Sequence, residues 1–219
     1  MKLLSTEFDF NNFLKTWALF NISNHLLKKN YSKQQSENII AGMHAVFSLF
    51  LSGRNDIKRL RWFSSAYFVH DFIQLVFSKK LNIMKLAYMY HHLSGIYLLS
   101  CDSREVPVQD ILFWGELSNL PSYPLYYYLH KKGPKNINIV HFFQILQKIL
   151  YCGIRIPMLS RKMINYILTT NTKKHMFAII PVYLMGMIWG GKILSQKMIK
   201  EQVEHHPLYP LDIQDIYVD

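Results

Sequence analysis

Apolar stretches separated by short charged clusters run along most of the chain. The clusters include Lys28/Lys29, Lys79/Lys80 and Lys173/Lys174. Between them lie segments close to the ~17–25 residues that a membrane-spanning helix needs. Seven such segments are predicted as helices: Phe10–Leu27, Asn38–Gly53, Trp62–Phe77, Leu86–Cys101, Ile111–Leu129, Ile139–Leu159 and Met176–Leu194. The pattern predicts an all-α fold, a multi-pass transmembrane helical bundle of about six to seven spans.

Two of these segments are imperfect. Lys15 interrupts the first, and the fifth contains the helix breakers Pro121 and Pro124. The competing interpretation is a soluble all-helical domain with unusually apolar helices. We divide the chain into residues 1–36 with the first span, a membrane domain at residues 37–199, and a soluble tail at residues 200–219.

Polar side chains recur at helical spacing within the apolar segments. The sets that share a helix face are His44, Ser48 and Ser52; Ser64, Tyr67, Asp71, Gln74 and Ser78; Glu116, Asn119 and Tyr123; and His141, Gln144, Lys148, Tyr151 and Arg155. Such helices can enclose a polar interior and present apolar backs to lipid. They can also simply hydrogen-bond to each other, at ~0.6–2 kcal/mol per bond. For the last set we prefer this second interpretation, because Lys148 and Arg155 can reach a membrane interface.

The pair His91-His92 lies inside an apolar stretch, and the preceding and following segments carry Asp71 and Glu116. Ionisable groups at membrane depth usually face a cavity or a partner and often serve a function. Imidazole transfers protons near neutral pH and can attack activated acyl groups. A carboxylate such as Asp71 could fix the tautomer of the ring. We therefore predict His91, His92 and Asp71 as catalytic candidates.

Residues on the same faces complete the predicted site. Adjacent helical residues differ by about 100° in direction, so one histidine can face a cavity while the other packs sideways. Gly95, one turn from the pair, would allow close approach of a helix or lipid chain. The ligand-binding candidates are Glu116, Tyr67, Tyr88, Asn119 and His44.

Structural and metal-binding roles compete with this interpretation. Buried histidines often only bridge helices, and for His44, His141 and His175 taken singly that role is favoured. The ten histidines show none of the HxxxH or HxxHH spacing of membrane di-iron enzymes. No metal is expected, because ligands would have to be gathered from several helices with oriented outer-shell partners.

Composition excludes other classes. Half of the 219 residues are hydrophobic and 18% are charged, against roughly 25% in an ordinary soluble domain. The net charge of +11 is spread over nearly every loop. This distribution suits anionic lipid headgroups and argues against a nucleic-acid partner.

Cys101 and Cys152 form no paired motif, and Met1–Lys15 lacks the apolar core of a signal peptide. Loop charges do not decide the orientation.

Four segments resemble, in the same order along the chain, the TLC-domain family, which is named after translocating-chain-associating, longevity-assurance and ceroid-lipofuscinosis proteins. They read NIIAGMH at Asn38–His44, SAYFVHDF at Ser65–Phe72, MYHHLSG at Met89–Gly95 and GELSNLP at Gly115–Pro121. The resemblance implies an integral membrane domain of about six to eight spans in the endoplasmic reticulum or a related membrane. It covers about Glu37 to Ile199.

Ceramide synthases of this family transfer an acyl group from acyl-CoA to a sphingoid base. The resemblance implies that His91 and His92 match their catalytic histidines and Asp71 their preceding aspartate. The later double-acid pattern of those enzymes is missing here, where the chain reads Gln109-Asp110 and then GELS at Gly115–Ser118. This region is more similar to the smaller TLC-domain-containing proteins, which are linked to membrane phospholipid composition.

Three functions stay open at this point. The favoured one is a membrane protein that binds or handles lipid acyl chains, with membrane lipids as partners. The second is an acyltransferase with acyl-CoA as co-substrate and no bound cofactor. The third is a structural role beside other membrane proteins. Homo-oligomerisation and the role of the tail are left undecided.

Overall fold

In a computed structural model, the described residues are 8–78, 82–101, 106–130, 136–169 and 174–198. They form nine α-helices and one π-helical segment and contain no strand, which confirms the all-α class for this part of the chain. The elements are α1 (Phe10–Leu27), α2 (Lys33–Gly53), α3 (Ile57–Val76), α4 (Ile83–Ser100), α5 (Val108–Asn119), α6 (Ser122–His130), α7 (Ile137–Gln147), η1 (Lys148–Arg155), α8 (Ile156–Thr169) and α9 (Met176–Ser195).

Short polar side chains define where many helices begin. Five helices start with a side chain that accepts a hydrogen bond from a first-turn backbone N–H: Asp9, Ser32, Asp56, Asn82 and Asn136. Between α2 and α3, Asn55 adopts a φ of 58°, in the left-handed region that asparagine tolerates. This short turn reverses the chain, so α2 and α3 are antiparallel neighbours.

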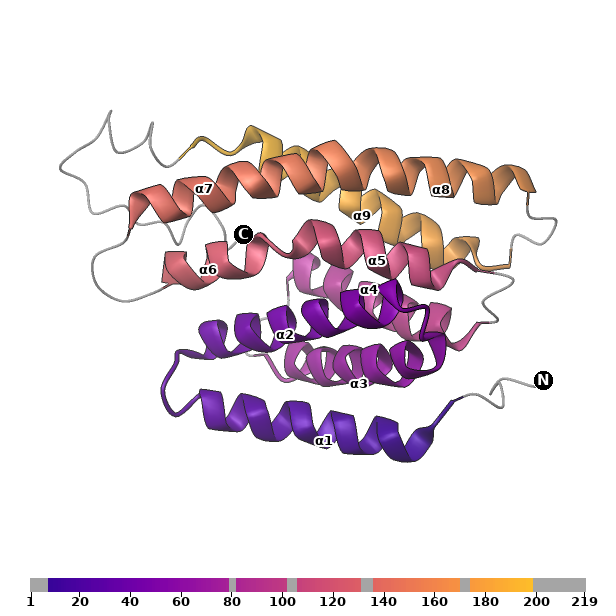
Figure 1. Ribbon diagram of the computed structural model, residues 1–219, viewed down its shortest axis with the longest axis horizontal. Coiled ribbons are helices and arrows are strands. Elements are labelled where there is room, and N and C mark those ends of the chain that lie inside the picture. Colours follow the sequence, from indigo (N-terminus) through magenta and orange to yellow (C-terminus); the bar gives the residue numbers. More distant parts are fainter. Residues whose placement is uncertain (1–7, 79–81, 102–105, 131–135, 170–173, 199–219) are drawn as a thin grey trace.

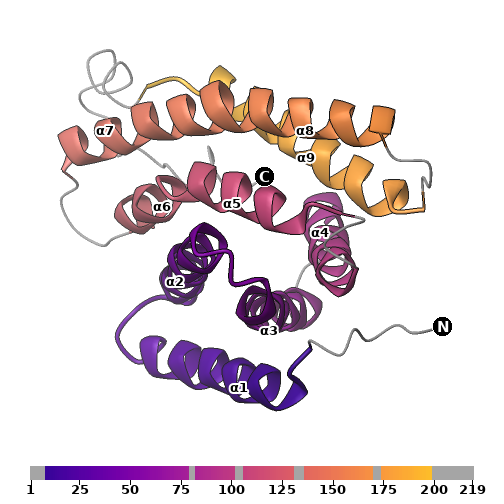
Figure 2. The ribbon, with the colours of Figure 1, turned by 45° about the vertical axis from the view of Figure 1, so that its right-hand side comes forward.

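The helices are arranged in layers, with α1 on one outer side, α2 to α6 in the middle, and α7, α8 and α9 on the opposite side (Figure 1). Helix α1 forms one outer side and packs on α3, as the rotated view also shows (Figure 2). Helices α4 and α5 lie further in, where α4 contacts α3 and α5 contacts α2. The long rod of α7, η1 and α8 forms the opposite side together with α9. Side chains from α2, α3, α4 and α5 therefore meet in the middle of the molecule.

Each of the seven predicted segments is mostly helical, but several boundaries differ: α2 and α3 each begin five residues earlier than predicted, and the fifth and sixth segments need larger corrections. The fifth segment is not one helix: α5 ends at Asn119, Pro121 lies in the break, and α6 begins at Ser122. With 12 and 9 residues, each piece is shorter than the ~17–25 residues needed to cross a membrane. The sixth segment is longer than predicted, because the rod continues to Thr169.

Among the described residues, two helical stretches are long and apolar enough to cross a membrane, Ile137–Thr169 with 33 residues and Met176–Ser195 with 20. The histidines, serines and lysines of the earlier helices lower their mean hydropathy below that of these two. The predicted tail, Glu201–Asp219, lies outside the described residues.

The molecule buries many polar groups and exposes many large apolar ones. Its exposed apolar side chains include Phe47, Phe50, Leu86, Leu93, Phe142, Ile149, Ile164, Leu168, Leu184 and Ile188. Its buried polar side chains include His44, Ser48, Ser64, His70, His92, Glu116, Gln144, Gln147 and Arg155. Ordinary soluble proteins rarely bury many polar groups or expose an extended apolar surface. Both features therefore point to a functional site or to contact with lipid or a partner.

Candidate functional site

A carboxylate–imidazole pair joins α3 to α4 in the interior. His92 Nε2 lies 2.8 Å from Asp71 Oδ2, and His92 is 5% exposed. An ionised carboxylate only accepts hydrogen bonds, so Nε2 is the donor and Asp71 fixes the tautomer. The lone pair of the neutral ring is then on Nδ1, which is buried and has no hydrogen-bond partner. Asp71 thus leaves one nitrogen of His92 available for another group.

Close packing of α3 against α4 makes this contact reachable. A Cβ atom on Gly95 would lie 2.8 Å from Cε2 of Phe68, closer than real side chains approach. The missing side chain therefore lets the Phe68 ring sit directly on α4. Phe68 also contacts the ring of His92, with centroids 5.4 Å apart. The close approach predicted at Gly95 is made by a neighbouring helix.

A second polar cluster connects α2, α3 and α5 around His44. His44 Nε2 lies 2.9 Å from Ser48 Oγ and 3.1 Å from Ser64 Oγ. Its Nδ1 lies 3.5 Å from Glu116 Oε1. Tyr123 donates a hydrogen bond of 3.4 Å to Glu116 Oε2. The predicted polar faces of these helices meet here, and His44 and Glu116 belong to one group.

Tyr67 lies between the two clusters. Its ring stacks on His44 with centroids 4.0 Å apart and an interplanar angle of 12°. The same ring meets His92 edge-on, with centroids 6.4 Å apart. Tyr67 is buried. The carboxylate–imidazole pair and the His44 cluster are therefore parts of one continuous layer, which we call the central polar layer: His44, Ser48, Ser64, Tyr67, Asp71, His92, Glu116 and Tyr123.

His91 and Tyr88 face away from this layer, toward α9 and η1. The rings of His91 and His92 are 5.5 Å apart at an interplanar angle of 74°, as expected for neighbours on a helix. Nδ1 of His91 is buried and has no hydrogen-bond partner. Tyr88 packs edge-on against Trp189 of α9, with centroids 4.7 Å apart. The two histidines thus serve different sides of α4.

Arg155 is the functional candidate that the sequence interpretation missed. It was expected to extend to an interface, but it is only 8% exposed and donates a 2.9 Å hydrogen bond from Nη1 to Asn119 Oδ1. Its guanidinium also lies 4.5 Å from the centre of the Tyr151 ring. The bond to Asn119 joins η1 to α5, which is the helix–helix hydrogen bonding preferred for this set, although the Arg155 side chain is buried and does not reach an interface. Lys148 is half-buried, and its Nζ donates to the backbone oxygen of Gln196.

The correct signal was present in the pattern of this segment. Gln144, Gln147, Tyr151 and Arg155 are all buried, whereas Phe142 and Ile149 are exposed. The polar stripe therefore faces inward and the apolar side faces outward. This is the arrangement predicted for the other striped helices.

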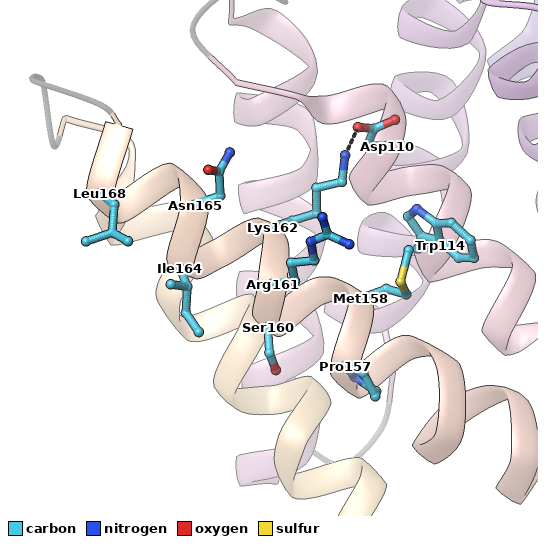
Figure 3. A pocket seen from close by; sticks show the side chains of 10 residues that line it. All are labelled: Asp110, Trp114, Pro157, Met158, Ser160, Arg161, Lys162, Ile164, Asn165 and Leu168. Atoms are coloured by element: carbon cyan, nitrogen blue, oxygen red, sulfur yellow. Dashed lines mark hydrogen bonds and ion pairs between the residues drawn. The ribbon is translucent and has the colours of Figure 1, made fainter.

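Pockets in the described part of the chain lie away from the central polar layer. One lies between α5 and α8, with Trp114, Met158 and Arg161 among its lining residues, and Lys162 beside it forms an ion pair with Asp110 (Figure 3). Lys162 also lines the second pocket, and the third lies around the turn between α2 and α3. The shared hollow expected around Asp71, His91, His92 and Glu116 stays a prediction, since none of these side chains lines one of the three pockets.

Within the described ranges, no group of three or more His, Cys, Asp or Glu side chains is arranged to hold a metal ion. Comparison with known proteins finds no matching family model, no similar curated protein and no similar solved structure. The resemblance to the TLC-domain family therefore rests on the four sequence segments alone.

Proposed function

We propose that this chain is a multi-pass membrane protein of TLC type that binds or handles lipid acyl chains and thereby influences membrane lipid composition. One observation carries the proposal: titratable side chains from α2, α3, α4 and α5, of which His44, His92 and Glu116 are buried and Asp71 is partly exposed, form one layer inside a bundle that exposes many large apolar side chains. Ionisable groups surrounded by hydrocarbon are expensive to maintain and usually mark a functional site.

Helix α4 supports a lipid as ligand, because its two histidines combine polar anchors with an apolar flank. Nδ1 of His91 and Nδ1 of His92 are both buried without hydrogen-bond partners. A hydroxyl, amine or amide of a lipid headgroup could bond to these atoms. Leu86 and Leu93 of α4 are exposed and would contact acyl chains beside the pair.

Native mass spectrometry of the protein extracted from membranes tests this function. Wild-type protein is expected to retain lipid, whereas the double variant His91→Ala/His92→Ala should lose it. His25→Ala is the matched control, because His25 is exposed near the end of α1 and lies outside the polar layer. Equal lipid retention in all three proteins, or none in the wild type, would remove the proposal and favour a structural role.

An acyltransferase reaction is the second candidate, and the tautomer of His92 favours it. Asp71 holds the Nε2 proton, so the lone pair on Nδ1 can attack the carbonyl carbon of an acyl thioester. The C–S bond then breaks, coenzyme A leaves as a thiolate, and an acyl-imidazolium remains, with its Nε2–H still hydrogen-bonded to Asp71. A lipid amine or hydroxyl next attacks this acyl group, restores the imidazole and loses its proton to a nearby base. Acyl-CoA is the co-substrate in this scheme.

Labelled acyl-CoA distinguishes the two functions. Incubation with the purified protein should leave an acyl adduct on His92, or on His91, that peptide mass spectrometry locates. Asp71→Asn keeps the shape of the side chain but fails to hold the correct tautomer, so it should reduce the adduct. Absence of both an adduct and turnover with any lipid acceptor would leave lipid binding alone.

The proposal also includes residence in the endoplasmic reticulum or a related membrane, with about six to seven crossings. The apolar outer surfaces of α2 and α4 support crossings beyond α7–α9. Accessibility of single engineered cysteines in the loops, measured from each side of sealed microsomes, counts the crossings. Loops between successive spans should alternate in accessibility, and a chain with only two crossings would not give that alternation.

A further inference from the structure

Arg155 is a buried cation that the described protein leaves without a carboxylate in contact. Its side chain has two partners, the amide oxygen of Asn119 and the face of the Tyr151 ring. Its Nε is buried and has no hydrogen-bond partner. Since a guanidinium offers five N–H donors in a planar fork, most of its bonding capacity is unused.

Glu116, an acidic group within electrostatic range of Arg155, is engaged elsewhere. Its two carboxylate oxygens lie next to His44 and Tyr123. Arg155 is also within electrostatic range of His91. Nδ1 of His91, like Nε of Arg155, is buried and has no hydrogen-bond partner. A buried charge with incomplete partners destabilises a fold by several kcal/mol unless another group compensates. An anionic ligand would supply that compensation.

Two features of the backbone lie next to the guanidinium. Arg155 is the last residue of η1, and π-helical turns occur frequently at functional sites. Helix α9 carries Gly186 opposite Nε, where an added Cβ atom would lie 3.7 Å from Nε. A larger side chain at this position would therefore pack against the guanidinium.

We propose that Arg155 binds the phosphate group of a phospholipid whose acyl chains occupy the site on α4. This inference rests on the proposed lipid-binding function and adds the class of lipid. Phosphate oxygens accept two parallel N–H bonds from one guanidinium, which matches the unused fork. The location inside the helical bundle favours a lipid as the source of the phosphate, although the phosphates of acyl-CoA have the same chemistry.

Competition binding in detergent solution tests the proposal with defined probes. Native mass spectrometry would compare phosphatidylcholine and phosphatidic acid with diacylglycerol and ceramide, which lack phosphate. Wild-type protein should prefer the phosphate-bearing pair by at least about tenfold, the ratio expected from one charge-assisted contact. Acyl-CoA and inorganic phosphate, added as competitors, separate the two sources. Displacement of phospholipid by acyl-CoA but not by phosphatidic acid would overturn the lipid assignment.

Substitutions at Arg155 decide whether the guanidinium causes that preference. Arg155→Gln should remove the preference while leaving diacylglycerol binding, and Arg155→Lys should restore part of it. Arg161→Gln, an equal loss of charge at an exposed position of α8, should keep the preference. A purely structural Arg155 would lower thermal stability without changing the ratio between phosphate-bearing and phosphate-free lipids, and that result would overturn the inference.

The outcomes separate this inference from the function on which it rests. If the wild type binds none of these lipids, lipid binding itself fails. If it binds diacylglycerol and phospholipid equally, and Arg155→Gln behaves in the same way, lipid binding stands and the phosphate assignment fails.

Discussion

The buried side chains of His92 and Arg155 differ in whether they contact a group of opposite charge. At the interface of α3 and α4, Asp71 meets His92 directly at 2.8 Å, so each provides a partner for the other. At η1, Arg155 meets only a neutral amide and an aromatic ring. Removing one member of a closed pair leaves the other uncompensated, whereas an open charge already lacks a partner of opposite charge. The comparison therefore separates a part of the interior whose charges satisfy each other from the part where we propose an anionic ligand.

Asp71→Ala should have the largest effect on stability. It leaves His92 Nε2 without its carboxylate, and a lost hydrogen bond to a charged group costs about 1.5–3 kcal/mol. Because the Asp71 side chain is 28% exposed, we expect about 2 kcal/mol after allowance for solvent screening. Thermal unfolding in detergent measures the change. Asp110→Asn breaks an exposed ion pair with Lys162 and should lower stability by less than about 1 kcal/mol. Equal losses in the two variants would contradict a structural role for the pair.

Gly95→Ala should destabilise almost as much, because it separates the helices that carry the pair. The new Cβ would meet the Phe68 ring at 2.8 Å, and overpacking of this kind typically costs about 1–3 kcal/mol. Gly191→Ala on α9 meets nothing within 4 Å and should be neutral or slightly stabilising. Thermal unfolding of the two variants gives the comparison directly. A Gly95→Ala protein as stable as Gly191→Ala would mean that α3 and α4 are not closely packed.

Arg155→Met should change the stability of lipid-free protein much less than Asp71→Ala does. The substitution removes one hydrogen bond and a contact with Tyr151, but it also removes a buried charge that has no carboxylate partner. Replacing buried charges by apolar side chains is often neutral, so we expect a change within about 1 kcal/mol. Thermal unfolding after delipidation measures it. A loss of about 3 kcal/mol or more would show that Arg155 is as tightly integrated as the closed pair.

Tyr123→Phe should have the smallest effect. The hydroxyl donates one long hydrogen bond, 3.4 Å, to Glu116, and its removal should cost about 0.5 kcal/mol. The readout is the unfolding midpoint together with a double-mutant cycle against Glu116→Gln. A coupling well above about 1 kcal/mol would indicate that Tyr123 belongs to the supporting structure of the layer.

Local patterns in the sequence were sufficient for most of the fold. Apolar segments indicated where helices lie, and the first predicted segment coincides with α1, Phe10–Leu27. The break at Pro121 followed from its chemistry, but its consequence, two helices too short to span a bilayer, depends on tertiary packing. The extension of the rod to Thr169 was missed because the charged residues Arg161 and Lys162 interrupt the apolar pattern after Leu159.

The candidate site was only partly predictable. Helical spacing grouped the polar side chains into faces, which explains why Asp71, Glu116 and His44 were found. Their partners depend on how helices distant in the chain pack, so the pairings Asp71–His92 and His44–Glu116 were not accessible from spacing alone. The inward position of Arg155 agrees with the polar stripe of its segment, but its partner Asn119 on α5 depends on helix packing that spacing does not give.

Photo-crosslinking with a phospholipid that carries a diazirine on its acyl chain tests the central claim most directly. Lipid bound at the buried polar groups should label peptides from α4, Ile83–Ser100, and this labelling should disappear in His91→Ala/His92→Ala but persist in His25→Ala. Labelling confined to the exposed outer faces, and unchanged by the double substitution, would contradict the account.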